Sequence, residues 1–153
     1  MRLRKLDHSA LVVQDLEKAS WFYGEVLGLQ EVPRPKNFTF GGRWFQGPDF
    51  QLHLILAQDT TAPAGFADAG EAALVGLAHH LAFEVEDLDE TIAHLRAHQV
   101  EIVGGPMLRG DGVIQMYVYD PDRNFLEFFV WDRQSSLHVE ERAAMRQGSP
   151  DAH

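Results

Sequence analysis

Four side chains that could bind a metal ion recur at nearly matching positions in the two halves of this sequence. His8 and His80 are 72 residues apart, and each stands seven residues before an Asp-Leu pair. A second pair of ligand-type residues, His53 and Glu127, is separated by 74 residues. Imidazole and carboxylate groups are common ligands of divalent cations. The near-constant offset therefore predicts two similar modules that contribute to one metal site.

Each candidate ligand lies in a strand-like run, on the face opposite an apolar set of side chains. In the run from 125 to 131, Glu127 alternates with Leu126, Phe128 and Val130, which would pack under a helix. His53 is similarly opposed by the apolar residues at 50, 52, 54 and 56. A buried carboxylate without a partner costs several kcal/mol, which coordination to a cation would offset. Alternation therefore places the four groups on a partly polar second face.

The order of predicted elements is the same in both halves, namely a strand, a helix and then three strands. In the second half the strand-like runs lie over 77–86, 100–103, 106–108, 113–119 and 125–131, and the residues at 120–124 predict a turn. An Asp before each helix is a suitable N-cap, and Gly28 is a natural stop for the first helix. This order predicts an α+β fold with two βαβββ modules. We expect a first module over 1–57, a linker over 58–76, a second module over 77–132, and a C-terminal tail or short helix over 133–153.

Composition limits the possible partners. The 153 residues carry a net charge of −10, which argues against nucleic acid or an anionic membrane as the main partner. There are no cysteines, so a metal must be held by nitrogen and oxygen. No apolar run approaches the roughly 20 residues that span a bilayer, and the N-terminus does not resemble a signal peptide. We expect a cytoplasmic protein that binds a small molecule.

Simpler interpretations exist for several of these residues. A lone histidine in a strand is usually a surface or hydrogen-bonded residue, and Glu127 could pair with an arginine instead of a metal. His79 points away from His80 and is interpreted as a packing or surface residue. His94 and His98 are four residues apart, as in some zinc sites. We assign them to a solvated helix face because they lie off the apolar stripe of that helix.

These motifs together make the chain resemble the vicinal oxygen chelate superfamily. This superfamily includes glyoxalase I, methylmalonyl-CoA epimerase, extradiol dioxygenases and bleomycin-binding proteins. The resemblance covers about residues 5 to 132. It is carried by the segments His8 to Val13, Trp21 to Leu29, His80 to Leu88 and Asp120 to Glu127. The combination is specific for the fold and only weakly specific for the reaction.

The resemblance implies an open, curved mixed sheet around a metal-site cavity, with helices on the convex side. It implies His8, His53, His80 and Glu127 as the metal ligands. It also implies a homodimer whose sites mix strands from two chains. The metal would be a divalent ion such as Zn, Ni, Mn, Fe or Co, among which the ligand types do not distinguish.

The sequence departs from bacterial glyoxalase I at several positions, including Arg123, which replaces a glycine in the turn before the last strand. His53 stands where glutamate is common, and Val12 and Ala57 stand where an arginine and an asparagine help to hold glutathione. A glutathione-dependent reaction is therefore in doubt. Histidine at position 53 is similar to a less-characterised glyoxalase-like subgroup.

Three functions remain open on this basis. The first is a metal-dependent lyase or isomerase in which Glu127, or alternatively His53, moves a proton next to a metal-bound carbonyl. The second is an extradiol-type dioxygenase with Fe(II) held by His8, His80 and Glu127. The third is a resistance protein that binds an antibiotic without catalysis.

Overall fold

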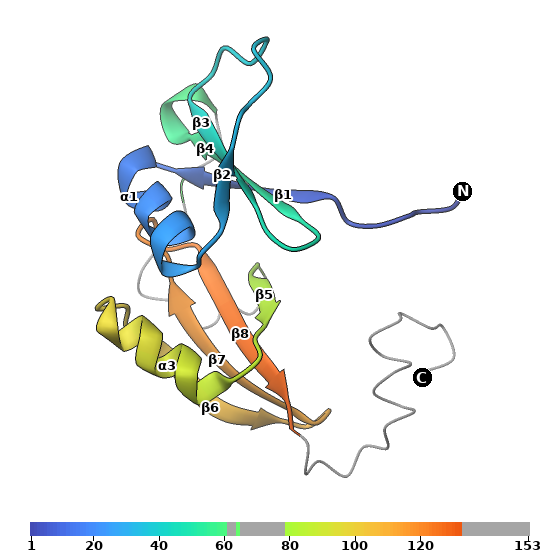
Figure 1. Ribbon diagram of the computed structural model, residues 1–153, viewed down its shortest axis with the longest axis vertical. Helices are drawn as coiled ribbons and strands as arrows, with labels where there is room; N and C mark the ends of the chain where they lie inside the picture. Colours follow the sequence, from blue (N-terminus) through green and yellow to red (C-terminus); the bar gives the residue numbers. More distant parts are fainter. Residues whose placement is uncertain (61–63, 65–78, 133–153) are drawn as a thin grey trace.

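The chain folds into two four-stranded mixed sheets, one from each half of the sequence (Figure 1). The computed structural model describes residues 1–60, 64 and 79–132. The first sheet has the order β1-β4-β3-β2 and the second has the order β5-β8-β7-β6. The strands are β1 (His8–Val13), β2 (Gln30–Val32), β3 (Gly42–Gln46), β4 (Gln51–Leu56), β5 (Leu81–Glu84), β6 (Ile102–Arg109), β7 (Val113–Tyr119) and β8 (Phe125–Trp131).

One helix follows the first strand of each sheet, as the repeated pattern predicts. α1 (Leu16–Ser20) continues as a π-helical segment (Trp21–Val26), and α3 (Leu88–Ala97) follows β5. Asp15 accepts hydrogen bonds from the amides of Glu17 and Lys18, and Asp87 accepts one from the amide of Glu90. The two predicted N-caps are thus confirmed. Gly28 ends the first helix with a φ of 70°, a conformation that favours glycine.

The expectation of an α+β fold with two βαβββ modules is confirmed. In both sheets the first and last strands, β1 with β4 and β5 with β8, pair in parallel, and the remaining pairs are antiparallel. α1 and α3 lie on the same side of the molecule in Figure 1. A short 3-10 helix (Ala57–Asp59) begins the predicted linker. Most of that linker and the whole predicted C-terminal tail lie outside the described residues.

Two strand boundaries differ from the sequence interpretation. The strand predicted over 77–86 is shorter, because the hydrogen-bonded ladder with β8 begins at the pair Leu81 and Leu126. His80 therefore lies just before β5. The two strands predicted at 100–103 and 106–108 form the single strand β6, which keeps its pairing with β7 through two register shifts. Pro106 is tolerated there because β6 is an edge strand.

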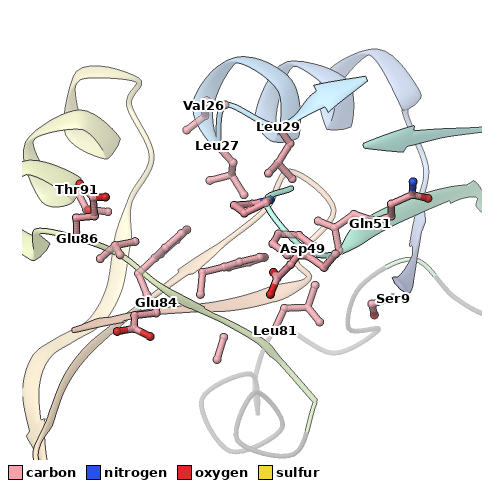
Figure 2. Close-up of a pocket in the computed structure, with 18 of the residues that line it drawn as sticks. Ser9, Val26, Leu27, Leu29, Asp49, Gln51, Leu81, Glu84, Glu86 and Thr91 are labelled. Carbon is pink, nitrogen blue, oxygen red and sulfur yellow. The ribbon is translucent and has the colours of Figure 1, made fainter. Parts of the chain in front are cut away.

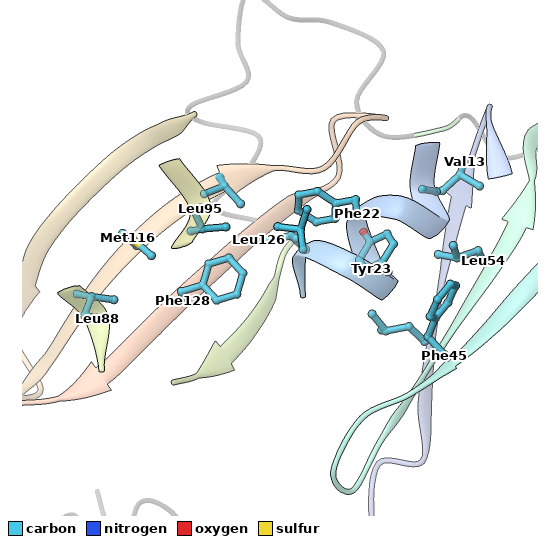
Figure 3. Close-up of a cluster of buried hydrophobic side chains, with 14 residues drawn as sticks. Val13, Phe22, Tyr23, Phe45, Leu54, Leu88, Leu95, Met116, Leu126 and Phe128 are labelled. Atoms are coloured by element: carbon cyan, nitrogen blue, oxygen red, sulfur yellow. The ribbon is translucent and has the colours of Figure 1, made fainter. Parts of the chain in front are cut away.

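A single hydrophobic core joins the two modules (Figure 3). The predicted inward faces of the last strands are confirmed, since Leu52, Leu54, Leu126 and Phe128 are buried. Figure 3 shows Phe22 between the first-module and second-module side chains. The core includes Val13, Tyr23, Phe45, Leu88, Leu95 and Met116.

Polar contacts also fix one module against the other. The Tyr23 hydroxyl donates a 2.7 Å hydrogen bond to Oδ2 of the buried Asp120, which begins the predicted turn before β8. The amide of Gln14 donates to Asp122 in the same turn. On α3, the His94 ring lies 2.8 Å from the carbonyl oxygen of Val26 and is tilted against the ring of His98. His94 therefore joins α3 to the first module, although the sequence predicts a solvated face.

Candidate functional site

The four candidate ligands form two close pairs, one in each module. In the first sheet, the rings of His8 and His53 stack with centroids 4.2 Å apart. In the second, Nε2 of His80 lies 3.2 Å from Oε2 of Glu127. Within residues 1–60, 64 and 79–132, no three His, Asp or Glu side chains gather closely enough to hold a metal ion. Each described module thus presents two of the four candidate ligands.

The two pairs are built by the same strand geometry. In the parallel ladder of β1 and β4, Ala10 is the register partner of His53, and His8 stands two residues before it. In the ladder of β5 and β8, Ala82 is the partner of Glu127, and His80 again stands two residues before it. Side chains two residues apart on a strand share a face. Both halves therefore place one donor from the first strand beside one donor from the last.

The His80–Glu127 pair has a spacing that suits a shared cation. Two ligands about 2.1 Å from one ion are about 3.0–3.4 Å apart when the angle between them is between octahedral and tetrahedral. The observed 3.2 Å between nitrogen and oxygen falls in that interval. Glu127 is only 2% exposed, although it is a carboxylate. A nitrogen and oxygen donor set of this kind fits a divalent cation.

Glu127 also has an arginine partner. Nη1 of Arg109 lies 3.1 Å from Oε1 of Glu127 and 3.1 Å from Oε1 of Gln115, and the rest of the guanidinium binds Asp111. The arginine pairing considered from the sequence therefore exists together with the histidine contact. It occupies Oε1, whereas His80 contacts Oε2.

His53 lies between two flat rings. The indole of Trp44 stacks on it with centroids 3.9 Å apart and an angle of 4° between the planes, while His8 covers the other side. Burial is the first cause that lowers the pKa of His53, and the nearby His8 lowers it further. His53 therefore stays uncharged to lower pH than an ordinary histidine, which suits both a metal ligand and a base.

His8 contacts a carboxylate. Its Nδ1 lies 3.2 Å from Oδ2 of Asp7, a contact that lowers the pKa of this aspartate together with Lys5. Metal-binding histidines commonly donate their second ring nitrogen to such a carboxylate. Asp7 and Arg109 were missed by the sequence interpretation. Asp7 could have been found from its place beside His8, whereas Arg109 is 18 residues from Glu127 and gives no local signal.

A large cleft lies between the modules (Figure 2). Its volume is about 1320 Å³, and it is bordered by His8 from the first module and His80 from the second. Figure 2 shows Leu27 and Leu29 on one side and Leu81 with Glu84 on the other. One donor from each pair thus faces the same mostly apolar space.

Comparison with known proteins supplies the family. Residues 5–128 match the model of the Glyoxalase/Bleomycin resistance protein/Dioxygenase superfamily. The chain belongs to this superfamily. The predicted resemblance is therefore confirmed.

The similar proteins include an epimerase and an uncharacterized protein. Over 103 residues the chain is 30% identical to mouse mitochondrial methylmalonyl-CoA epimerase, covering 65% of this chain and 56% of the epimerase. The chain thus spans just over half the length of that relative. It is 23% identical to the uncharacterized protein YwbC of Bacillus subtilis, covering 82% and 97% of the two chains.

Solved structures share the fold. A glyoxalase family protein from Bacillus anthracis superposes with a TM-score of 0.68 at 28% identity, covering 86% of this chain and 98% of that one. TnmS3, an antibiotic-binding protein from Streptomyces sp. CB03234, superposes with a TM-score of 0.66 at 25% identity, covering 86% and 99%. The similar proteins thus include one named as an epimerase and one named as an antibiotic binder, so function must be argued from the site.

Proposed function

We propose that this protein is a divalent-metal-dependent lyase or isomerase that moves a proton beside a carbonyl of a small molecule with neighbouring oxygens. The observation that carries the proposal is the equivalent pairing of His8 with His53 and of His80 with Glu127 at one register in both sheets. The cytoplasmic location stays a prediction of the sequence, and none of the described helices is long and apolar enough to cross a bilayer.

We propose further that the complete site forms between two copies of the chain. A divalent cation in such a site needs three or four protein ligands, and each described pair offers two. In a symmetric dimer, His8 and His53 of one copy would meet His80 and Glu127 of the other, which yields two complete sites. The separation of the pairs within one chain supports this arrangement.

The cation would supply Lewis acidity toward the substrate oxygens. As a loosely held ligand, Glu127 would release Oε2 to take the substrate proton, while Arg109 on Oε1 holds the carboxylate in position. His53 is the alternative base, because its lowered pKa keeps the imidazole neutral.

Metal analysis followed by kinetics tests this proposal. Protein purified without chelator is expected to hold a divalent metal, and a screen of α-hydroxycarbonyl and thiohemiacetal substrates is expected to find turnover. Glu127→Gln should abolish that turnover, whereas Glu101→Gln, at an exposed position, should not. Full activity of Glu127→Gln would remove Glu127 as the proton carrier. Oxygen uptake with a catechol under Fe(II) would instead indicate the dioxygenase.

One observation favours a second candidate, a binder of flat aromatic antibiotics. Phe38 packs edge-on against Trp44, and the guanidinium of Arg34 lies over the rings of Phe38 and Phe40. These side chains form an aromatic wall beside His53, and Phe38 is 38% exposed. The similarity to the antibiotic-binding TnmS3 supports this alternative. Protein that lacks metal after mild purification, yet binds flat aromatic compounds, would establish it.

A further inference from the structure

A chain of side-chain amides leads from the β3–β4 hairpin to the ring of His53. Nε2 of Gln46 lies 2.7 Å from the carbonyl oxygen of Gly47 and 2.9 Å from that of Phe50. Carbonyl oxygens only accept hydrogen bonds, so this atom must be the amide nitrogen. The oxygen of Gln46 is then free to accept, and its orientation is fixed by the turn.

The orientation of the Gln46 amide determines the orientation of the Gln51 amide. Gln46 and Gln51 are register partners across the hairpin, and Nε2 of Gln51 donates to Oε1 of Gln46 at 2.8 Å. Turning the Gln51 amide over would bring two acceptor oxygens together. The carbonyl oxygen of Gln51 therefore points away from Gln46 and lies 3.0 Å from Nε2 of His53.

This geometry determines where His53 carries its proton. An amide oxygen only accepts, so the imidazole nitrogen beside it must donate. A neutral imidazole has one N–H, and the other nitrogen then carries the lone pair. The stacked rings of Trp44 and His8 cover both faces of His53 and oppose rotation of the ring out of this contact.

We propose that Gln46 and Gln51 are positioning residues that fix the proton of His53 on Nε2 and so make Nδ1 the atom that binds the cation. The choice of Nδ1 as ligand rests on the proposed metal site, whereas the position of the proton does not. The hydrogen bond made by one ring nitrogen commonly sets which nitrogen of a histidine is metallated.

Nitrogen NMR of the metal-free full-length protein tests the position of the proton. Protein with ¹⁵N-labelled histidine is studied at about pH 8, above the ordinary histidine pKa of about 6.5, and His53→Asn identifies the signals of His53. We expect the shift of an unprotonated nitrogen at Nδ1 and an Nε2 proton that exchanges slowly with water. A proton on Nδ1 would overturn the proposal, and this wild-type result requires no variant to fold.

Variants then test the amide chain itself. Gln51→Leu should make the Nε2 proton of His53 exchange at least about tenfold faster, because the acceptor is lost. Gln46→Leu should have a smaller effect in the same direction, since Gln51 stays but can turn. Gln58→Leu, at an exposed position outside the hairpin, is the matched control and should change nothing. If the Nε2 proton of His53 exchanges with water equally slowly in Gln51→Leu and wild type, Gln51 does not position this proton.

Cadmium identifies the ligand atom. With ¹¹³Cd bound, coupling to ¹⁵N is expected at Nδ1 of His53, and coupling at Nε2 would overturn the choice of ligand atom. If cadmium does not couple to either nitrogen of His53, this residue is not a metal ligand, and the choice of Nδ1 as ligand atom is wrong as well. The metal-free spectrum still decides which nitrogen carries the proton. Failure of the metal site and failure of the proton assignment are therefore distinguishable.

Discussion

Nη1 of Arg109 lies 3.1 Å from Oε1 of Glu127, on the opposite oxygen from the one that His80 contacts. The carboxylate is almost fully buried, while Arg109 is partly exposed at the end of β6. Arg109 thus balances the charge of Glu127 through one oxygen, while His80 contacts the other, which is the oxygen that the proposed cation would bind. This arrangement predicts that the arginine stabilises the metal-free protein and weakens its metal binding.

Replacing Arg109 should reveal both effects. Arg109→Met should lower the free energy of unfolding of the metal-free protein by about 1–3 kcal/mol, because a buried carboxylate loses a charged partner that is itself partly screened by water. Saturating Zn²⁺ or Mn²⁺ should then raise the melting temperature of Arg109→Met more than that of wild type. Urea unfolding and thermal melts, with and without metal, give both values.

The matched control for this prediction is Asp111→Asn. It removes the charge of the partly exposed partner of the same guanidinium and leaves the Glu127 contact in place. A cost below about 1 kcal/mol is expected there. If Arg109→Met unfolds like wild type, the arginine does not compensate Glu127, and the observed distance has no energetic consequence.

A site shared between two copies predicts that two inactive variants restore each other. His8→Ala and Glu127→Gln should each lose metal as pure dimers. A mixed dimer with differently tagged chains would carry both substitutions in one site and leave the other site intact. We expect about half the wild-type metal content and activity in that mixed dimer. If each site were formed within one chain, both sites of the mixed dimer would carry one substitution and neither would bind metal. An inactive mixed dimer would therefore contradict a site shared between two copies.

The stack of Trp44 on His53 predicts a change in titration. Burial is the largest cause that lowers the pKa of His53, and Trp44 covers one face of the ring. Trp44→Leu should therefore move this pKa upward, toward its ordinary value of about 6.5. A depressed histidine pKa destabilises the fold as pH falls below about 6.5, because only the unfolded chain takes up the proton. The variant should lose less stability than wild type between pH 7 and pH 5.

Proton NMR titration of the His53 ring checks the pKa, and urea unfolding at both pH values checks the linkage. Phe38→Leu serves as control, since Phe38 contacts Trp44 rather than His53. An unchanged His53 pKa in Trp44→Leu would show that the indole does not desolvate the imidazole.

The fold was largely predictable from the sequence because strand alternation and helix caps are local signals. Glu127 could be assigned to a face because Leu126 and Phe128 flank it, and both are buried. The amide chain from Gln46 to His53 could not be predicted, since glutamines in a hairpin are common and their orientation depends on register. The pairing of Arg109 with Glu127 likewise depends on how β6, β7 and β8 pair, which no local pattern determines.

The hydrogen bond between Tyr23 and Asp120 predicts how stability depends on the contact between the two modules. Tyr23 on the first module donates to Asp120 on the second, and burial, reinforced by the charge of Asp120, raises the pKa of the tyrosine well above its ordinary value. Tyr23→Phe leaves Asp120 with its Asn124 contact but removes a hydrogen bond to a charged group. It should cost about 1.5–3 kcal/mol of stability at pH 8.

The pH dependence of that loss separates this hydrogen bond from simple packing. A group whose pKa is raised in the folded state contributes stability below its unfolded value, about 10 for tyrosine, and loses it as pH rises further. Wild type should therefore lose stability above pH 10 faster than Tyr23→Phe, and the difference between them should narrow. Urea unfolding at pH 8 and pH 10.5 measures this. Because Tyr23→Phe keeps the ring and removes only the hydroxyl, equal stability of the variant and wild type at pH 8 would mean that Tyr23 acts through packing against Phe22 and Phe45 alone, and that the Asp120 contact does not hold the modules together.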